Sequence, residues 1–570
     1  MRHPMDNQNT NQPNGAEAMV RLLAAHGTEQ IFGLCGDTSL PFYDALYRLD
    51  HGMTHFLTRD ERHAAYMADA YARVTGKVGV CEGPSGGGAT YILPGVVEAS
   101  ESSIPILAIT TDVSVPSAGR FPLTELRQDQ LFQPLTKWNG LIEHPDRIGN
   151  MVRSAFRAMT TGTPGAAHLA FPFDVQKASV NGDDIWAQGE FANFPAWPTA
   201  PTSQSIEAAV RALLTAKNPV IICGGGAVIA GAESELKQLA ETLNIVVATT
   251  VSGQGSLSEN HTNCLGVVGS NGGVPATRAV LMDADLVMFI GCRAGSVTTE
   301  RWRYPAPGTP IIHIDSNPMA ISASYETAYP VLGDAKLALS ALNQAIADET
   351  TVPNFGGDKA ITAAKAEKFA IFDKLAASND QPIKPERTVS DLNAVLDDDA
   401  VIVCDPGTPC PYFSAYYKFN KPGRHFISNR AHGALGFSIP AAMGAQVGRP
   451  NSKVVSVMGD GSFAFAVGEF ETIARYQLPI LFIVFSNSVF GWIKAGQRAG
   501  FEERYFSVDF SQTDHAKVAA AYGIKSWRVE NPAELRSVLA EAAKHDGPAL
   551  VDVISQPLNE ANAPVSEWIA

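Results

Sequence analysis

Two patterns of apolar and polar positions alternate along this chain. Short, continuous apolar runs are typical of strands buried on both faces of a parallel sheet, and longer stretches with apolar residues at helical spacing are typical of covering helices. The apolar runs form three groups, at residues 30–34, 78–81, 104–110 and 166–171, then 219–223, 245–250, 284–290 and 310–314, then 401–404, 454–458, 480–485 and 549–554. Residues 56–58, in the first group, are also strand-like. The pattern predicts an α/β fold with three doubly wound parallel sheets.

Two polar stretches divide these groups. Residues 176–203 are rich in Pro, Asn, Asp and Trp, and residues 348–382 are polar and then helical. Such stretches are typical of connections between domains. We therefore expect three domains, at residues 15–180, 204–347 and 383–556.

The most informative stretch lies in the third group. The apolar run 454–458 ends in Gly459-Asp460-Gly461-Ser462, and the run 480–485 ends in Ser486-Asn487. Strands joined through a helix usually lie parallel, so Asp460 and Asn487 are expected to converge at one sheet edge. Their oxygens suit Mg²⁺, and Gly459 and Gly461 allow the backbone to approach a phosphate at a helix N-terminus. Taken by itself, a Gly-Asp-Gly turn also suits a purely structural role.

Composition narrows the classes of partner. The chain has 570 residues, a hydrophobic content of 45%, a charged content of 18% and a net charge of −15. These values describe a compact globular protein and argue against nucleic acid or an anionic membrane as a partner. They leave room for a local cationic pocket that binds an anionic substrate.

Cysteine usage and apolar run lengths bear on localisation. The seven cysteines include no CxxC pair and suit buried thiols in a reducing compartment. Residues 1–14 are polar and lack the apolar core of a secretion signal, and no apolar run approaches the ~20 residues of a membrane span. We expect a cytoplasmic protein without a membrane partner.

The Gly-Asp-Gly turn followed by an asparagine resembles the cofactor motif of the thiamin diphosphate family that includes acetolactate synthases, pyruvate oxidases and 2-oxo acid decarboxylases. The resemblance implies that thiamin diphosphate is the cofactor. It also implies that Asp460, Asn487 and the carbonyl of Val489 bind Mg²⁺. Ser486 stands where the family often has a second asparagine.

Glu61 opens a predicted helix in the first group. A glutamate in a first helical turn often serves as a solvated charge favoured by the helix dipole. The surrounding RDERHAAYMADAYARVTGKVGVC, however, resembles the family's glutamate segment. The resemblance implies that Glu61 is catalytic and hydrogen-bonds N1′ of the cofactor's aminopyrimidine, which helps to remove the proton from C2 of the thiazolium ring.

The resemblance extends over residues 16–554 and names the three domains as pyrimidine-binding, central nucleotide-binding-like and diphosphate-binding. It implies that Leu435, an apolar residue two positions after Gly433, lies beneath the bent cofactor. A place in the hydrophobic core would also suit Leu435. Other positions implied to surround the cofactor are Gly407, Thr408, Gly433, Gly461, Ser462, Phe490 and Gly491.

The central domain leaves its ligand open. The segments GCRAG at 291–295, HIDS at 313–316 and GDAKLAL at 333–339 resemble FAD-binding segments, which makes Arg293, Asp315 and Asp334 candidate contacts. FAD, an adenine nucleotide without flavin, and an empty domain all remain open. The glycine run 224–226 also suits a tight strand-to-helix turn.

The expected function is that of a thiamin diphosphate- and Mg²⁺-dependent lyase or transferase. It would decarboxylate a 2-oxo acid and then act as a carboligase, as acetolactate synthase does. Alternatives are a 2-oxo acid decarboxylase, a flavin-linked oxidase, or a hydrolase that cleaves a 1,2-dione. A non-catalytic nucleotide-binding homologue is disfavoured because Glu61 and Asp460 are both present.

The resemblance further implies a homodimer or homotetramer with active sites at the subunit interface, and a small 2-oxo acid or dione as substrate. Gly496 stands near where acetolactate synthases carry a tryptophan that shapes the acceptor site. Glu82 is unusual for that family and suggests a polar or hydroxylated substrate. The roles of Asp37, Glu82 and His432 stay open.

Overall fold

The computed structural model describes residues 12–568. The chain forms two compact units, one ending at Ala196 and the other beginning at Trp197. No helix within the described residues is long and apolar enough to cross a membrane. Most of the polar segment 1–14 lies outside the described residues. At its end, the side chain of Asn14 accepts a hydrogen bond from Glu17 N and caps the first helix.

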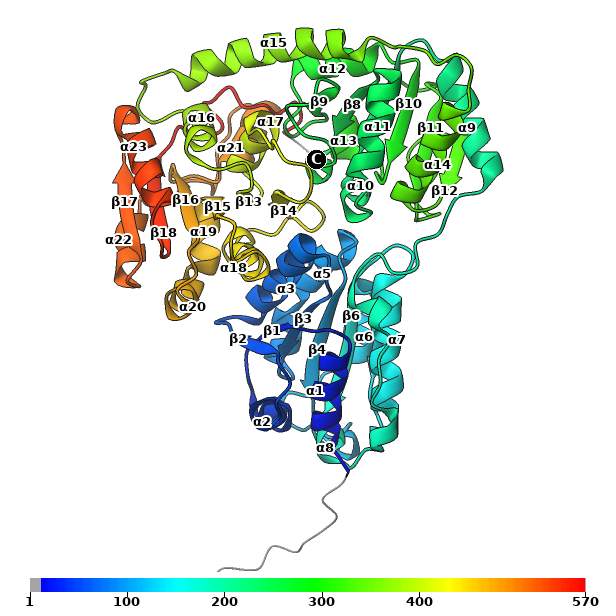
Figure 1. The fold of residues 1–570 in the computed structure, drawn as a ribbon. Coiled ribbons are helices and arrows are strands. Elements are labelled where there is room, and N and C mark those ends of the chain that lie inside the picture. Colours follow the sequence, from blue (N-terminus) through cyan, green and yellow to red (C-terminus); the bar gives the residue numbers. More distant parts are fainter. Residues whose placement is uncertain (1–11, 569–570) are drawn as a thin grey trace, which may run out of the picture. The chain divides into compact units, whose positions relative to one another are not determined.

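The first unit contains a six-stranded parallel sheet in the order β2-β1-β3-β4-β6-β5 (Figure 1). Its strands are β1 (Gln30–Gly33), β2 (Thr54–Leu57), β3 (Gly79–Gly83), β4 (Ile106–Asp112), β5 (Trp138–Leu141) and β6 (Ala167–Pro172). Its helices are α1 (Gly15–Ala25), α2 (Leu40–Arg48), α3 (Glu61–Thr75), α4 (Gly87–Tyr91), α5 (Leu93–Glu101), α6 (Gln128–Phe132), α7 (Ile148–Thr160) and α8 (Phe173–Lys177).

Helix α3 shows why the sequence folds this way locally. Asp60 caps its N-terminus by accepting a hydrogen bond from Arg62 N at 2.8 Å. Gly76 ends it in a left-handed conformation with φ of +71°. The alanines between these ends are buried, and a Cβ on Gly95 of α5 would lie 2.4 Å from the Ala65 Cβ. Small residues therefore let α3 and α5 pack closely.

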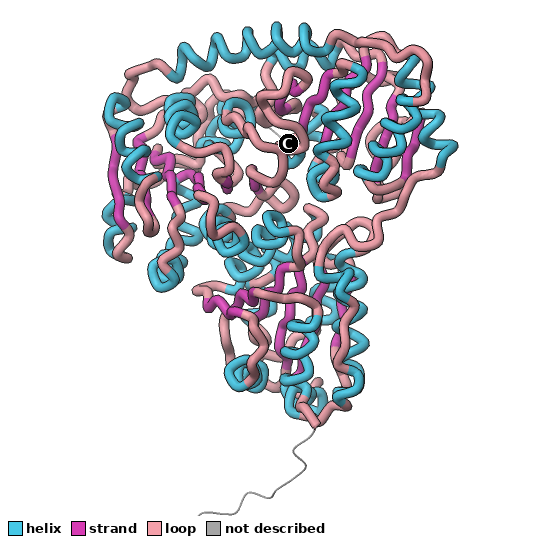
Figure 2. The backbone as a smooth tube through the Cα atoms, viewed as in Figure 1, coloured by secondary structure: helices cyan, strands magenta, loops and turns pink. Residues whose placement is uncertain are grey.

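The second unit begins with a central parallel sheet in the order β12-β11-β10-β7-β8-β9. Its strands are β7 (Pro219–Cys223), β8 (Val246–Thr249), β9 (Cys264–Val267), β10 (Leu286–Ile290), β11 (Ile311–Asp315) and β12 (Tyr329–Leu332). The accompanying helices are α9 (Ser203–Thr215), α10 (Gly225–Ile229), α11 (Glu233–Leu243), α12 (Pro275–Met282), α13 (Ser296–Thr299) and α14 (Ala335–Ala347). Figure 2 shows the strands of this sheet flanked by helices.

A third parallel sheet in the same unit has the order β14-β13-β15-β16-β18-β17. Its strands are β13 (Val401–Cys404), β14 (Phe426–Ser428), β15 (Val454–Gly459), β16 (Leu481–Ser486), β17 (Lys525–Val529) and β18 (Ala549–Ile554). The accompanying helices are α15 (Gly357–Ala376), α16 (Pro385–Val395), α17 (Pro409–Tyr416), α18 (Ser438–Gly448), α19 (Asp460–Ala466), α20 (Phe470–Tyr476), α21 (Gly491–Gly500), α22 (His515–Ala521) and α23 (Pro532–Ala543).

One hydrophobic cluster joins the central and third sheets. It includes Val220 of β7, Phe372 of α15 and Val553 of β18, so apolar side chains run continuously between the two sheets. Helix α15, which the sequence indicated only as the helical end of a polar connection, contributes to this core. The second unit is therefore held together by apolar burial as well as by the chain connection.

The α/β fold with three parallel sheets is confirmed. The strands of each sheet fall within the residue ranges expected for the three domains, whose boundaries stay predictions. Five strands were not predicted from the sequence, and they are β5, β9, β12, β14 and β17. All five lie at the edges of their sheets.

Candidate active site

Two neighbouring strands of the third sheet end at the predicted metal residues. Strands β15 and β16 pair in parallel, with Gly459 opposite Phe485, so their carboxyl ends meet at one edge. The Asp460 carboxylate reaches across this edge, and its Oδ2 accepts hydrogen bonds from Asn487 N at 2.8 Å and Ser488 N at 2.6 Å. The expected convergence of Asp460 and Asn487 is confirmed.

The Asp460 carboxylate is buried but well supplied with donors. Its side chain is 4% exposed, and its Oδ1 accepts a third hydrogen bond, from Gly461 N at 2.9 Å. Burial raises the pKa of Asp460, while the three backbone N–H groups act in the opposite direction. Ser488, which donates one of them, has a left-handed φ of +58°, a conformation that costs energy for a serine.

The oxygens at this edge fit a hard cation. Asp460 offers a carboxylate and Asn487 an amide oxygen. The Asn487 Nδ2 is buried without a hydrogen-bond partner among the described residues. The Val489 carbonyl accepts Gly491 N at 2.9 Å and retains a second lone pair. The described part of the chain holds no group of three or more His, Cys, Asp or Glu placed so that it could bind a metal ion. A carboxylate, an amide and a carbonyl suit Mg²⁺, which retains water or phosphate oxygens in its remaining positions.

Glycines at this edge leave open space. A Cβ on Gly407, Gly433 or Gly459 would meet no described atom within 4 Å. Gly407 and Gly433 also have φ values of +108° and +72°, which favour glycine. An anionic group could therefore approach the backbone closely at these three turns, of which the sequence predicted this for Gly459.

Four other predicted residues lie in close contact in pairs. A Cβ on Gly461 would lie 2.7 Å from the Phe490 ring, and a Cβ on Gly491 would lie 3.3 Å from Thr408 Oγ1. These contacts place the turn after β13, the start of α19 and the start of α21 together. The structure thus brings Thr408, Gly461, Phe490 and Gly491 into one region.

Asp405 organises this region and was not singled out from the sequence. Its wholly buried carboxylate accepts hydrogen bonds from Gly436 N, Phe437 N, Ser438 N and Ser438 Oγ, at 2.7–3.2 Å. Burial raises the pKa of Asp405 to about 6. Asp405 ties the turn at residues 405–408 to the turn that carries Gly433 and Leu435. An aspartate directly after the apolar run 401–404 was the only sequence signal for it.

Leu435 lies in that second turn and is half-buried, so it is not a residue of the closed core. The neighbouring Gly436 packs closely on α19, where a Cβ would lie 2.6 Å from the Phe465 Cβ. Ser462, on the same helix, is 4% exposed, and His432 is exposed. An apolar side chain left partly uncovered beside open glycines agrees with the predicted position of Leu435 beneath a cofactor.

Glu61 belongs to the first unit, where it opens α3 directly after the Asp60 cap. Its side chain is 7% exposed and lies against the turn after β3. A Cβ on Gly83 would lie 3.2 Å from Glu61 Cγ, and a Cβ on Gly88 would lie 3.1 Å from Glu61 Oε1. Burial raises the pKa of Glu61, and the nearby carboxylates of Asp60 and Glu82 add to this rise. The solvated surface role that a first-turn glutamate often has is therefore wrong for Glu61.

Glu82 forms a second buried acid in the same unit. It is 0% exposed, its Oε1 accepts a hydrogen bond from the Tyr43 hydroxyl, and His55 Nε2 lies 3.5 Å away. Gly33 makes room for it, because a Cβ there would lie 2.0 Å from Glu82 Oε1. Within the first unit, Glu82 thus contacts protein groups rather than solvent. Asp37, by contrast, is exposed.

The candidate nucleotide residues lie along the carboxyl edge of the central sheet. Arg293 follows β10, Asp315 ends β11, and Asp334 follows β12. Both carboxylates already have backbone partners, since Asp315 Oδ1 accepts Asn317 N at 2.8 Å and Asp334 Oδ1 caps α14 by accepting Leu337 N at 3.1 Å. The edge is therefore assembled as expected, but these hydrogen bonds do not in themselves indicate a nucleotide.

Packing accounts for the glycine run in the central domain. A Cβ on Gly224 would lie 2.2 Å from the Gly291 carbonyl oxygen, and one on Gly226 would lie 2.7 Å from Gly291 Cα. Gly226 N also donates a hydrogen bond to the same oxygen at 3.0 Å. The backbone of this turn needs glycine for its own close approach. This packing accounts for the glycine run and does not in itself indicate FAD.

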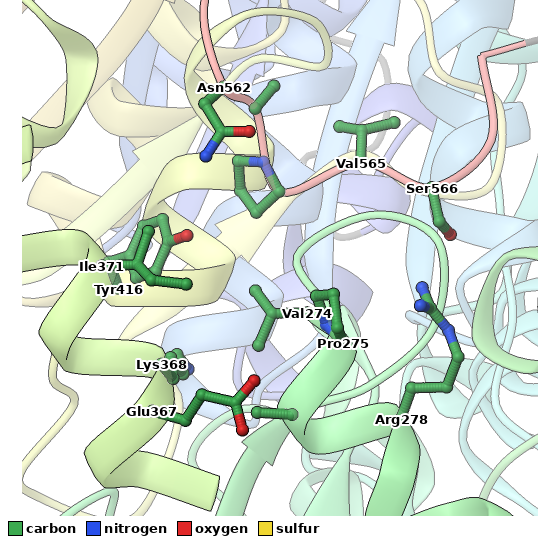
Figure 3. Close-up of a pocket in the computed structure, with 14 residues that line it drawn as sticks. Val274, Pro275, Arg278, Glu367, Lys368, Ile371, Tyr416, Asn562, Val565 and Ser566 are labelled. Atoms are coloured by element: carbon green, nitrogen blue, oxygen red, sulfur yellow. The ribbon is translucent and has the colours of Figure 1, made fainter.

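A cavity of about 300 Å³ lies elsewhere in the second unit (Figure 3). Its walls come from the start of α12, from α15 and α17, and from residues 562–566. Arg278 on this wall already pairs with Glu300 at 2.7 Å, and Glu367 adds a negative charge. None of the residues predicted from the sequence lines this cavity.

Comparison with protein families agrees with the three sheets. Residues 13–133 match the model of the thiamine pyrophosphate enzyme N-terminal TPP binding domain, residues 206–342 match the central domain, and residues 405–553 match the C-terminal TPP binding domain.

Curated relatives match over nearly the whole chain. A probable acetolactate synthase large subunit from Methanococcus aeolicus is 37% identical over 560 residues, covering 95% of this chain and 92% of the relative. One from Methanocaldococcus jannaschii is 35% identical over 552 residues, with the same coverage. The acetolactate synthase isozyme 3 large subunit from Escherichia coli is 30% identical over 535 residues, covering 93% and 92%.

Proposed function

This chain belongs to the thiamine pyrophosphate enzymes and is similar throughout to acetolactate synthase large subunits, and on that premise we propose the reaction that it catalyses. The enzyme decarboxylates a 2-oxo acid with thiamin diphosphate and Mg²⁺, and joins the remaining fragment to a second carbonyl compound. The observation that carries this proposal is the strand-tip edge, where the Asp460 carboxylate clamps the backbone of Asn487 and Ser488.

At this edge the chain holds the charged end of the cofactor. Asp460, Asn487 and the Val489 carbonyl would bind Mg²⁺. The open turns at Gly407, Gly433 and Gly459 give a diphosphate access to the backbone. The same region contains Thr408, Gly461, Ser462, Phe490 and Gly491. The half-buried side chain of Leu435 would contact the rings of the cofactor.

Glu61 supplies the acid–base function. When bound, thiamin diphosphate supplies a thiazolium ring that accepts the electron pair released when the substrate's C–C bond breaks. Glu61 would hydrogen-bond the aminopyrimidine N1′. Its burial in the first unit makes a change of charge costly, so the proton position on the bound ring responds strongly to this carboxyl.

Association of at least two copies of the chain is a further part of the proposal. Within the first unit, Phe121 is 94% and Leu123 is 84% exposed, although both are large apolar residues. A partner subunit that covered them would remove apolar surface from water. Light scattering coupled to gel filtration would give the mass of the assembly and distinguish a dimer from a tetramer.

Product analysis tests the reaction. The protein is incubated with thiamin diphosphate, Mg²⁺ and a panel of 2-oxo acids, with and without an aldehyde or a second oxo acid. We expect CO₂ release together with a carboligation product by mass spectrometry. Glu61→Gln should lower the rate ~10²–10⁴-fold, because this is the usual contribution of a positioned acid–base group. The exposed Glu367→Gln is the matched control and should not change it.

The same assay separates the alternatives. CO₂ and an aldehyde without ligation would identify a simple decarboxylase, and consumption of an electron acceptor would identify an oxidase. Cleavage of a 1,2-dione without CO₂ would identify a hydrolase. No turnover of any of these substrates would contradict the proposal. A visible absorption spectrum of the purified protein answers separately whether FAD is bound.

A further inference from the structure

A buried polar network lies directly behind the strand tip that carries Asn487. Asp552, on the neighbouring strand β18, is wholly buried. Its carboxylate accepts hydrogen bonds from the Ser486 hydroxyl, from His515 N at 3.1 Å and from Arg528 Nη1 at 3.0 Å. The Ser486 Oγ also lies 2.9 Å from His515 Nδ1. Since the only hydroxyl proton of Ser486 goes to Asp552, His515 Nδ1–H is the donor in that contact.

The network touches both elements that present the metal residues. Ser486 is the last residue of β16 and precedes Asn487. The His515 ring packs edge-on against Phe463 of α19, at 5.0 Å between ring centroids, and α19 begins with Asp460. Ser486, His515 and Asp552 therefore fix the end of one strand and the start of one helix at the same time.

The Asn487 side chain depends on this support. Its Nδ2 is buried and has no hydrogen-bond partner among residues 12–568. The backbone of Asn487 is held from the front, where its N–H donates to Asp460 Oδ2. The Ser486 side chain holds the backbone from behind. The direction of the amide oxygen is thus set by the strand end rather than by a contact of its own.

Stability alone does not require a charged network here. A buried carboxylate loses its hydration, and an apolar cluster of similar volume often stabilises a fold as well or better. Among the described residues, three donors offset this cost for Asp552, of which Arg528 is charged, and the His515 Nδ1 lies 3.4 Å from its Oδ1. Polar contacts of fixed direction provide a geometry that apolar packing does not define.

We propose that Asp552, acting through Ser486 and His515, is a positioning residue for the metal end of the active site. It holds the tip of β16 and the start of α19 so that Asn487 and Asp460 present their oxygens to one cation. This inference deepens the proposed function and rests on it. Asp552, Ser486 and His515 would act through Asn487 and Asp460 rather than by contact with the cofactor or substrate.

Metal affinity tests this proposal independently of turnover. Mn²⁺ replaces Mg²⁺, and free Mn²⁺ is counted by electron paramagnetic resonance in the presence of thiamin diphosphate. Ser486→Ala and Asp552→Asn should weaken Mn²⁺ binding about 10–100-fold, which is the usual effect of losing a group that orients a metal ligand. Activity should return largely at saturating metal, so the concentration of metal needed for half-maximal activity rises more than kcat falls.

The chain offers a matched control and a rescue. Ser456 is a buried serine in the adjacent strand β15, and its hydroxyl has no partner among the described residues. Ser456→Ala removes the same atom and should leave Mn²⁺ affinity within about threefold of wild type. Ser486→Thr keeps the hydroxyl and should restore most of the affinity. His515→Phe keeps a ring against Phe463, removes the nitrogen, and should show the same loss as Ser486→Ala.

Three results would overturn the inference. If the wild type binds Mn²⁺ with thiamin diphosphate and Ser486→Ala binds it equally well, the positioning role is wrong while the proposed function stands. A general loss of fold in Ser486→Ala would also reject a specific role for Ser486. It would be seen as a collapsed melting transition of Ser486→Ala and an equal fall in the Mn²⁺ affinity of Ser456→Ala. A wild type that binds no Mn²⁺ with thiamin diphosphate would overturn the proposed function and this inference together.

Discussion

The carboxyl edges of the central and third sheets are built alike and differ in the space that their glycines leave. Both sheets have six parallel strands and present an aspartate at a strand end, Asp315 in one and Asp460 at the start of α19 in the other. In the central sheet, a Cβ on Gly224 would collide with backbone at 2.2 Å, whereas a Cβ on Gly459 would meet no described atom within 4 Å. Glycine therefore allows close backbone packing at the central edge, whereas it leaves open space at the third.

The hydrogen bonds at the two edges differ in what they join. At the central edge, Asp315 and Asp334 accept backbone N–H groups from their own chain segments, two and three residues ahead. At the third edge, Asp460 spans from one strand tip to the next, and Asp405 spans from the turn after β13 to residues 436–438. A local cap stabilises a turn, whereas a carboxylate that joins separate segments sets their geometry. A strand-end aspartate thus indicates a cofactor site here only where it joins separate chain segments next to open space.

The largest expected effect separates the two aspartates. Asp460→Asn should lower activity ~10²–10³-fold. A bound metal supplies several kcal/mol of charge stabilisation, and a neutral amide binds that metal more weakly than a carboxylate does. Asp315→Asn should change activity no more than about threefold. Initial rates with saturating 2-oxo acid measure both. Equal losses in the two variants would mean that the central edge also takes part in the reaction and would break the comparison.

Two matched glycines, one at each edge, give the next largest expected effects. Gly224 and Gly459 both precede short helices as N-caps with negative φ. Gly459→Ala should weaken thiamin diphosphate binding at least ~10-fold, because the methyl group enters the open space, with a stability cost of up to about 1 kcal/mol from the poorer cap. Gly224→Ala should cost about 1–3 kcal/mol more in unfolding free energy, since the methyl group meets fixed backbone.

Calorimetric titration with the cofactor and denaturant unfolding measure these two quantities. If Gly459→Ala bound the cofactor normally, or if Gly224→Ala were as stable as Gly459→Ala, the distinction between an open and a closed edge would be wrong.

The smallest expected effect concerns pH and Asp405. Burial raises the pKa of this carboxyl from 3.8 to about 6. A group whose pKa is raised by folding stabilises the protein fully below its unfolded pKa, and that contribution is lost as the pH rises through the folded pKa. The wild type should thus lose stability relative to Asp405→Asn between about pH 4 and pH 7. Asp405→Asn lacks this titration and is less stable at acidic pH, because an amide accepts fewer of the four hydrogen bonds.

Melting temperatures of both proteins across this pH range test the prediction. The difference between wild type and Asp405→Asn should narrow as the pH rises. A difference that stays constant or widens would show that Asp405 remains charged in the folded protein throughout the range.

The sequence predicted the inner strands and missed the outer ones for a physical reason. Inner strands such as β15 and β16 are buried on both faces, so they read as continuous apolar runs. The missed edge strands lack such runs. Strand β17 reads KSWRV, and β12 reads YPVL with a proline, and both are largely exposed or half-buried. Edge strands tolerate polar residues and proline, which removes the pattern that prediction depends on.

The residues of the candidate site likewise include some that the sequence could predict and some that it could not. Asp460 and Asn487 were predictable because each lies two positions after the end of an apolar run, and topology alone brings such positions together. Asp405 and the contacts of Glu82 with Tyr43 and of Ser486 with Asp552 were not, since side-chain hydrogen bonds between distant residues leave no periodic signal. Glu61 required the family resemblance, because a first-turn glutamate by itself suits a solvated charge. Burial of Glu61 was found only in the structure.

One measurement tests the central claim most directly, namely a crystal structure of the protein with thiamin diphosphate and Mg²⁺. We predict a metal ion at about 2.0–2.1 Å from oxygens of Asp460, Asn487 and Val489, with the diphosphate seated against Gly407, Gly433 and Gly459. A cofactor bound at the carboxyl edge of the central sheet, or a metal that contacts neither Asp460 nor Asn487, would contradict the account.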